Sequence, residues 1–251
     1  MDESLYRGFD NRARTFFAQL GTDIDVSKPN RAILKKRFVD EVRRVLHPAP
    51  RDISGLRQCF NVAYWAYRKV RRRSGEAFVF HPLRSSLLVA WMESLYGVSD
   101  IELLYTTLLH DSYEEFGNAW FAQATIRSAV YFGPGTEVAT DVHHLSKKED
   151  ETSESYFFRL LTCGKWRVLL VKLVDRIDNI WTLDKKDPAR SARKIRETEA
   201  WFPRIIHETK GLVVAEFESN GRSQNWLELI SFVEGYLWYA VGEKKHEFNL
   251  I

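Results

Sequence analysis

The chain has 251 residues, of which 45% are hydrophobic and 28% charged, enough to bury a sizeable core. Its formal net charge of +3 is small for this length and argues against broad binding to nucleic acid. No apolar run reaches the roughly 18 residues that cross a bilayer, the first residues lack the apolar core of a signal peptide, and Cys59 and Cys163 fit no zinc-binding spacing. We expect a soluble, cytoplasmic protein with no membrane partner; a disulfide between the two cysteines stays open.

Apolar residues recur at spacings of three and four along most of the chain, which is typical of amphipathic helices. This spacing predicts helices over 30–46, 52–70, 81–96, 99–111, 136–145, 153–162, 165–183, 188–202 and 225–241. In the helix over 99–111, Ser99 is the expected N-cap, with Glu102 completing a capping box. The helix over 165–183 is rich in Val, Leu and Ile, but its length favours a buried helix over a strand.

The only plausible strand is 76–81 (EAFVFH), and it is too short to define a sheet. We therefore expect an all-α fold with a single globular domain. In this interpretation residues 1–48 form an N-terminal helical extension, 49–210 the main domain and 211–251 a C-terminal helical cap.

The segment LLHDSYEE places His110 beside Asp111 at the end of a predicted helix. Adjacent side chains point about 100° apart on a helix, so only a group beside the helix, such as a metal ion, could contact both. Glu114 and Glu115 lie three and four positions further on, near the face of Asp111. A lone His-Asp pair usually has a structural explanation, so a metal site requires further ligands elsewhere.

Two other segments offer such ligands. His81 lies in the first turn of a predicted helix, just before a proline that is tolerated there. Asp175 lies inside an apolar helix, where an ionised carboxylate is costly without a partner or a metal. Asn179 and Thr182 follow at four and seven residues and extend a polar stripe. A structural network could explain this stripe, but a chelating site beside a ligand pocket explains it with fewer coincidences.

Two groups of basic residues admit alternative interpretations. The cluster RKVRRRSG, residues 68–75, is either a solvated helix end or a phosphate-binding segment. The neighbours His143 and His144 could indicate a second metal site, but adjacent histidines near a helix end are more often surface groups.

Taken together, four separated motifs resemble the HD-domain metal-dependent phosphohydrolases, and in particular the alarmone hydrolase domains of the RelA/SpoT family and their small single-domain relatives. The matching segments are RRRSGEAFVFHPL, LLHDSYEE, FGPGTEVATDVHHLSK and VLLVKLVDRIDNIWTL. They occur in the family's order and near its spacings, from about Arg57 to Ile206. The main domain, 49–210, would then be an HD domain.

The resemblance implies that one divalent cation, usually manganese (Mn2+), supports hydrolysis of the 3′-pyrophosphate of (p)ppGpp to GDP or GTP and pyrophosphate. The family's metal ligands correspond to His81, His110, Asp111 and Asp175. Its acidic pair that prepares the attacking water corresponds to Glu114 and Glu115. Residues on the substrate side correspond to Arg72, Arg73, Asn179 and Thr182, with Lys172 and Arg176 also in motif, either in the pocket or in ion pairs outside it.

The sequence departs from the family's pattern around the substrate. Tyr67, Lys69 and Val70 replace its usual histidine-x-glycine-glutamine residues, and Asp178 stands where histidine is usual. Another nucleotide substrate, such as NADPH, an adenosine alarmone or a deoxynucleotide, therefore stays open, as do a non-catalytic nucleotide-binding role and neutralisation of an alarmone synthetase. We expect a small-molecule nucleotide partner and degradation without synthesis; the sequence does not indicate an oligomeric state.

Overall fold

The computed structural model describes residues 3–23, 25–114, 128–129, 131, 134–184, 186–218, 221 and 223–250. These residues form α1 (Glu3–Asp23), α2 (Arg31–Leu46), α3 (Pro50–Tyr67), α4 (Phe80–Tyr96), α5 (Ile101–Leu109), α7 (Thr136–Leu145), α8 (Ser153–Leu161), α9 (Trp166–Trp181), α10 (Pro188–Phe217) and α11 (Ser223–Glu247). Over the described residues there is no strand, and the single antiparallel bridge joins Arg71 to Ala77. The prediction of an all-α fold is confirmed.

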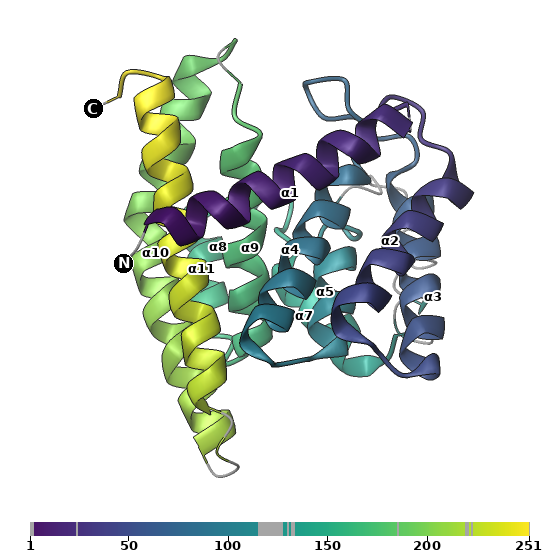
Figure 1. Ribbon diagram of the computed structural model, residues 1–251. Helices are drawn as coiled ribbons and strands as arrows, with labels where there is room; N and C mark the ends of the chain where they lie inside the picture. Colours follow the sequence, from purple (N-terminus) through teal and green to yellow (C-terminus); the bar gives the residue numbers. More distant parts are fainter. Residues whose placement is uncertain are drawn as a thin grey trace.

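The helices surround a central group made of α4, α5 and α9, which pack against one another. In Figure 1, α10 and α11 run alongside α9 on one side, and α2 and α3 form the opposite side against α4 and α5. Helix α1 crosses the front of the molecule, over α4, and reaches α11. The three central helices are the ones that carry the candidate metal ligands.

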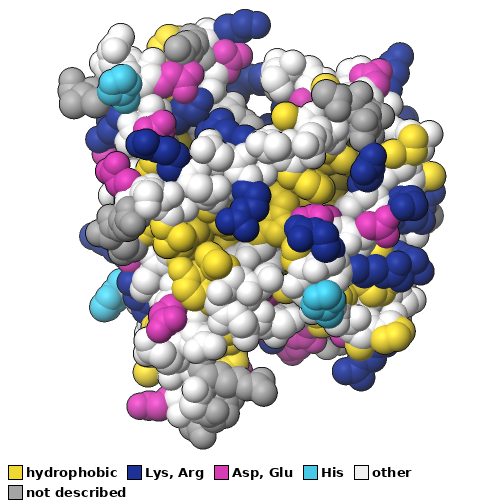
Figure 2. All heavy atoms as spheres, in the orientation of Figure 1, with side chains coloured by type: hydrophobic (Ala, Val, Ile, Leu, Met, Phe, Trp, Pro, Cys, Tyr) yellow, Lys and Arg dark blue, Asp and Glu magenta, His cyan; other side chains and the backbone are white. Residues whose placement is uncertain are grey.

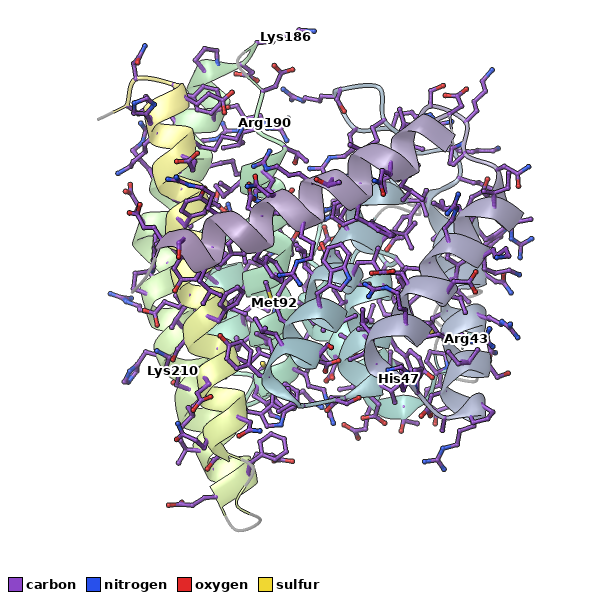
Figure 3. All side chains as sticks on the ribbon, viewed as in Figure 1. Arg43, His47, Met92, Lys186, Arg190 and Lys210 are labelled. Carbon is purple, nitrogen blue, oxygen red and sulfur yellow. The ribbon has the colours of Figure 1, made fainter. Side chains whose placement is uncertain are left out.

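The central helix α9 is buried along most of its length. Its predicted inward positions, Leu169, Leu173, Ile177 and Ile180, are fully buried, so the interpretation as a buried helix is confirmed. Figure 3 shows Met92 of α4 inside the helix assembly, whereas Arg43 and Lys210 project from its edges. Burial of these apolar side chains is the main term that stabilises such an assembly.

The start of α5 differs from the prediction, because Asp100 and not Ser99 caps the helix. The Asp100 carboxylate accepts a hydrogen bond of 2.9 Å from the backbone N–H of Leu103. Glu102 forms an ion pair with Arg167. A carboxylate one residue later reaches the same free N–H groups and also pairs with Arg167, so the Ser99 assignment was wrong by one position.

The described part of residues 1–48 forms two helices, although the sequence indicated one. Helix α1 packs its aromatic side chains on the far end of the chain, with Tyr6 and Phe9 against Phe232 and Tyr236 of α11. The boundary predicted between 210 and 211 falls inside α10, which continues to Phe217. The division into extension, domain and cap stays a prediction.

Other expectations about composition can be compared with the structure. Both cysteines are free, which excludes a disulfide between them. Over the described part of the chain, no helix has both the length and the apolarity needed to span a bilayer. On the face drawn in Figure 2, basic, acidic and apolar side chains are interspersed, so the basic side chains form no continuous stripe on that face.

Candidate metal centre

Three helices bring the four predicted metal ligands to one place. His81 lies in the first turn of α4, where Pro82 is tolerated because the first N–H groups of a helix lack partners within it. His110 caps the end of α5, and Asp111 begins the turn that follows. Asp175 comes from the middle of α9. Residues separated in sequence thus meet at the centre of the fold.

The side-chain atoms of these residues converge at short distances. His81 Nε2 lies 3.1 Å from Asp175 Oδ1 and 3.3 Å from Asp111 Oδ2. His110 Nε2 lies 3.1 Å from Asp111 Oδ2 and 3.6 Å from Asp175 Oδ1. Donor atoms of His81, His110 and Asp175 all lie within 4.8 Å of one another, and these residues are buried. The Asp111 side chain is about one-fifth exposed (20%), so the cluster opens toward solvent on that side.

The proton on the His110 ring can be placed from its surroundings. Its Nδ1 lies 2.7 Å from the backbone carbonyl oxygen of Thr107, which can only accept, so Nδ1 donates. In the neutral ring the lone pair is then on Nε2, a buried atom that makes no well-aligned hydrogen bond within the described structure. A buried polar atom without a partner is costly, and a cation would satisfy it. Two imidazole nitrogens and two carboxylates therefore fit a divalent transition metal ion.

The His81 ring is oriented by a residue that the sequence analysis treated only as a departure. Asp178 Oδ2 lies 2.6 Å from His81 Nδ1, and the Asp178 side chain is completely buried. Burial raises the pKa of Asp178, but the positive charge of Arg84 outweighs it and holds this pKa well below its usual range. The carboxylate therefore accepts from Nδ1–H, so in the neutral ring the lone pair of His81 lies on Nε2, facing the cluster. The sequence did contain a signal for this role, because Asp178 is an ionisable residue in an apolar helix, three positions after Asp175.

The carboxylates also determine how the imidazoles hold protons. Burial alone would lower the pKa of His81, but its hydrogen bonds to Asp111, Asp175 and Asp178 raise it to about 9. Burial likewise lowers the pKa of His110, and the negative charge of Asp111 raises it above the ordinary range. Because metal ligands must be deprotonated, cation binding at this cluster releases protons.

Glu114 lies in the turn after α5, three residues past Asp111. Its carboxylate accepts a hydrogen bond from the backbone N–H of Lys147, at the end of α7. Although the Glu114 side chain reaches solvent, the protein atoms around it and the negative charge of Asp111 raise its pKa to about 7. A carboxyl group with a pKa near neutrality can take up a proton at physiological pH. Its predicted partner, Glu115, lies outside the described residues, as do Phe132 and Gly133 of the third motif.

Arg72 is held against the polar stripe of α9. Its Nη1 donates to Asp178 Oδ2 at 2.9 Å, and its Nη2 donates to Asn179 Oδ1 at 3.1 Å and Thr182 Oγ1 at 2.8 Å. Arg72 begins a tight turn in which Gly75, at φ +89°, occupies the left-handed region that favours glycine. Asn179 also donates to Asp175 Oδ1 at 2.6 Å. The stripe therefore connects the candidate ligands to Arg72.

The other three predicted substrate residues lie in different environments. Lys172 donates to Asp175 Oδ2 at 2.8 Å and so lies beside the cluster. Arg73 is exposed and donates to Asp187 at the start of α10. Arg176 points away from the cluster: it is buried and donates to Glu197 of α10 at 2.6 Å. The structure brings Arg72, Lys172, Asn179 and Thr182 together, and does not bring Arg176 to them.

The second histidine pair lies apart from this cluster. His143 is exposed and His144 half-buried in the last turn of α7. Over the described residues, the only group of three or more His, Cys, Asp or Glu side chains with metal-binding spacing is the one that contains His81, His110 and Asp175.

Comparison with known proteins finds relatives that are similar to this chain in sequence. No family model matches the chain. Over 161 residues it is 29% identical to the bifunctional (p)ppGpp synthase/hydrolase SpoT of Escherichia coli K12, covering 63% of this chain and 22% of the relative. It is 24% identical over 168 residues to the guanosine-3′,5′-bis(diphosphate) 3′-pyrophosphohydrolase of Aquifex aeolicus, covering 67% of this chain and 23% of the relative.

A solved structure described as a metazoan ortholog of SpoT that hydrolyzes ppGpp gives a TM-score of 0.47 at 17% identity, over 75% of this chain and 98% of the other. The matched region amounts to about a fifth of the length of the curated relatives, 22% and 23%. The sequence comparisons confirm the predicted resemblance to the (p)ppGpp 3′-pyrophosphohydrolases of the RelA/SpoT family.

Proposed function

We propose that this chain is a metal-dependent phosphohydrolase that removes the 3′-pyrophosphate of guanosine alarmones, degrading them without synthesis, in the cytoplasm and with manganese as the cation. The observation that supports this most is the convergence of His81, His110, Asp111 and Asp175, with the Nε2 atoms of both imidazoles directed at two carboxylates. The named activity of the relatives supports the choice of substrate.

The residues around the cluster have distinct proposed roles. The four ligands would hold the cation, which when bound polarises a phosphate oxygen and lowers the pKa of water. Glu114 takes the proton from the attacking water onto its carboxylate. Arg72 donates to oxygens of the pyrophosphate in charge-assisted hydrogen bonds. Lys172, half-buried beside Asp175, keeps that ligand ionised through its positive charge.

The proposed reaction balances without a further reactant. The water oxygen bonds to the phosphorus next to the ribose 3′ oxygen, and the bond between that phosphorus and the 3′ oxygen breaks. The 3′ oxygen ends with a proton, which Glu114 can return after accepting it from water. The products are GDP or GTP and pyrophosphate.

The test is incubation of the purified chain with manganese and a panel of nucleotides: ppGpp, pppGpp, a 3′-pyrophosphorylated adenosine nucleotide and NADPH. We expect GDP or GTP and pyrophosphate from the guanosine compounds, separated by ion-exchange chromatography. Chelator should abolish turnover and manganese should restore it. The matched control is Asp111→Asn, which removes one charged ligand at constant size.

Three outcomes separate the alternatives. Full turnover in metal-free buffer would overturn the metal-dependent mechanism. Cleavage of another panel member in preference to ppGpp would replace the substrate but keep the reaction class. Nucleotide binding without any turnover would identify a non-catalytic binding protein.

A further inference from the structure

Asp178 is a buried carboxylate beside the cluster that contacts three charged or ionisable side chains, although none of the four motifs assigns it a role. It lies on α9, with no exposed surface. Its Oδ2 accepts from His81 Nδ1 at 2.6 Å and from Arg72 Nη1 at 2.9 Å, and its Oδ1 accepts from Arg84 Nε at 2.5 Å. One carboxylate therefore holds a candidate metal ligand and the arginine of the proposed substrate site.

The contact with His81 sets the direction of that ligand. When a carboxylate accepts from Nδ1–H, the ring rotation is fixed and Nε2 is left as the lone-pair donor, the usual arrangement for a metal-binding imidazole. His110 achieves the same result with the carbonyl of Thr107, on its own helix. His81 has no such local acceptor described: the group at its Nδ1 comes from a residue 97 positions away.

The contact with Arg72 sets the direction of the phosphate-binding group. Arg72 and His81 share the same acceptor atom, Oδ2. Asn179 and Thr182 hold the other terminal nitrogen of the guanidinium. A displacement of the Asp178 carboxylate would therefore move both the metal ligand and the arginine.

Arg84 holds both oxygens of this carboxylate, with its Nε donating to Oδ1 at 2.5 Å and its Nη2 to Oδ2 at 3.3 Å. Its guanidinium donates to Asp178, and at 2.7 and 3.0 Å to the two oxygens of Glu76. Two arginines, Arg72 and Arg84, are thus balanced by two carboxylates, Asp178 and Glu76. A buried charge is tolerated when it is paired and hydrogen-bonded in this way.

We propose that Asp178 is a positioning residue that orients His81 toward the cation and Arg72 toward the substrate's phosphate groups through one shared carboxylate. It couples metal affinity to phosphate recognition. The half of this proposal that concerns the phosphate rests on the proposed function, whereas the half that concerns His81 does not.

The test is Asp178→Asn, which keeps the size of the side chain but removes its charge and one acceptor atom. We expect manganese affinity, measured by calorimetry without nucleotide, to fall by about 10- to 100-fold. With diamagnetic zinc bound in place of manganese, the nitrogen chemical shifts of the His81 ring should show loss of the single Nδ1–H form. The KM for ppGpp should rise at saturating manganese.

Two matched variants separate positioning from general damage. Thr182→Val removes one contact of Arg72 and none of a candidate metal ligand, so it should raise KM and leave manganese affinity unchanged. Glu76→Gln loosens Arg84 while both contacts of Asp178 with His81 and Arg72 remain, so its effect on manganese affinity should be smaller than that of Asp178→Asn. Thermal unfolding checks that each variant is folded; if Asp178→Asn does not fold, Asp178→Glu, which keeps the charge but shifts it by one methylene, replaces it with the same expected direction.

Wild-type manganese affinity and an unchanged His81 ring signal in a folded Asp178 variant would overturn the proposal. Reduced manganese affinity with an unchanged KM would also overturn it, because the coupling to Arg72 would be absent. If the wild-type chain binds manganese but hydrolyses no alarmone, the proposed function fails while the calorimetric and ring-signal tests of Asp178 still decide its action on His81.

Discussion

The two faces of α9 carry charged residues that are neighbours in sequence but have different environments. Asp175 points to two imidazoles, from α4 and from the end of α5, and its carboxylate also engages Lys172 and Asn179 of α9. Arg176, the next residue, lies over the Phe202 ring at 4.7 Å and donates to one acidic residue of α10. Four side chains converge on Asp175, whereas Arg176 donates to one carboxylate. Both residues are buried, so burial does not distinguish the candidate site from a packing contact, but the number of converging polar groups does.

The largest effect should come from removing the central carboxylate on the site face. Asp175→Asn takes a charged ligand from the cluster while keeping its shape. We expect manganese affinity and turnover to fall together, turnover to the level of the chelated protein, because an amide is a weaker ligand. Calorimetry and a discontinuous nucleotide assay measure both. Retained manganese binding would mean that Asp175 belongs to a structural network.

The next effect concerns Glu114, which lies beside the ligands in sequence without being one in our interpretation. Glu114→Gln keeps size and hydrogen bonding but loses basicity, so the single-turnover rate should fall by about 10²- to 10⁴-fold with manganese still bound. Glu115→Gln is the matched control for the acidic pair. Loss of manganese binding in Glu114→Gln would make that residue a ligand, and near-wild-type rates in both variants would leave the pair without a role in catalysis.

The adjacent residues Arg72 and Arg73 should differ in their effect on the KM for ppGpp, and this effect is smaller than the two before it. Arg72→Ala should raise the KM for ppGpp by about 10- to 100-fold, because hydrogen bonds to charged groups contribute about 1.5 to 3 kcal/mol. Manganese affinity measured without nucleotide should stay unchanged. Arg73→Ala should change KM by no more than about threefold, since exposed ion pairs such as the one with Asp187 contribute roughly 0 to 1 kcal/mol. Equal effects of the two variants would place Arg73 in the phosphate site as well.

A mutation of Arg176, on the face of α9 that packs against α10, should leave the kinetics of the enzyme unaltered. Arg176→Met should leave kcat, KM and manganese affinity unchanged while lowering the free energy of unfolding by about 1.5 to 3 kcal/mol, because Glu197 loses one charge-assisted hydrogen bond but keeps its ion pair with Lys194. Urea denaturation followed by circular dichroism measures the loss. A raised KM without a change in stability would return Arg176 to the substrate site.

The smallest expected effect is the pH dependence of the ion pair between Arg176 and Glu197. Burial raises the pKa of Glu197, but Arg176 and Lys194 outweigh it, and the pKa lies below its usual value. The pair's contribution is therefore complete above the pKa of an unfolded glutamate, about 4.3, and is lost as pH falls through the lower folded value. The stability difference between the wild-type chain and Glu197→Gln should shrink below about pH 4. A difference that stays constant down to pH 2 would contradict this assignment.

The sequence was most informative where a motif fixed residue types at set spacings. The helical periodicity predicted α9 and its buried positions, and three of the four motifs indicated the residues that meet at the cluster. The position of a residue within a motif did not predict the direction in which its side chain points. Asp175 and Arg176 lie in the same motif, but successive residues turn by about 100° on a helix and face different neighbours. Asp178 could not be assigned a role, because its partners His81 and Arg84 lie 97 and 94 positions away and are recognised only after α4 and α9 pack.

The wide sequence separation of the candidate ligands has a consequence for how the protein acquires its native state. His81 and Asp175 are 94 positions apart (175 − 81), so the loop between them must close before both can hold one ion. The His110 orientation can form within its own helix, whereas that of His81 requires α4 to dock on α9. A cation that binds only the assembled cluster draws the folding equilibrium toward the native chain. The ion's availability in the cell would then govern how much of the protein persists folded, apart from how fast it turns over substrate.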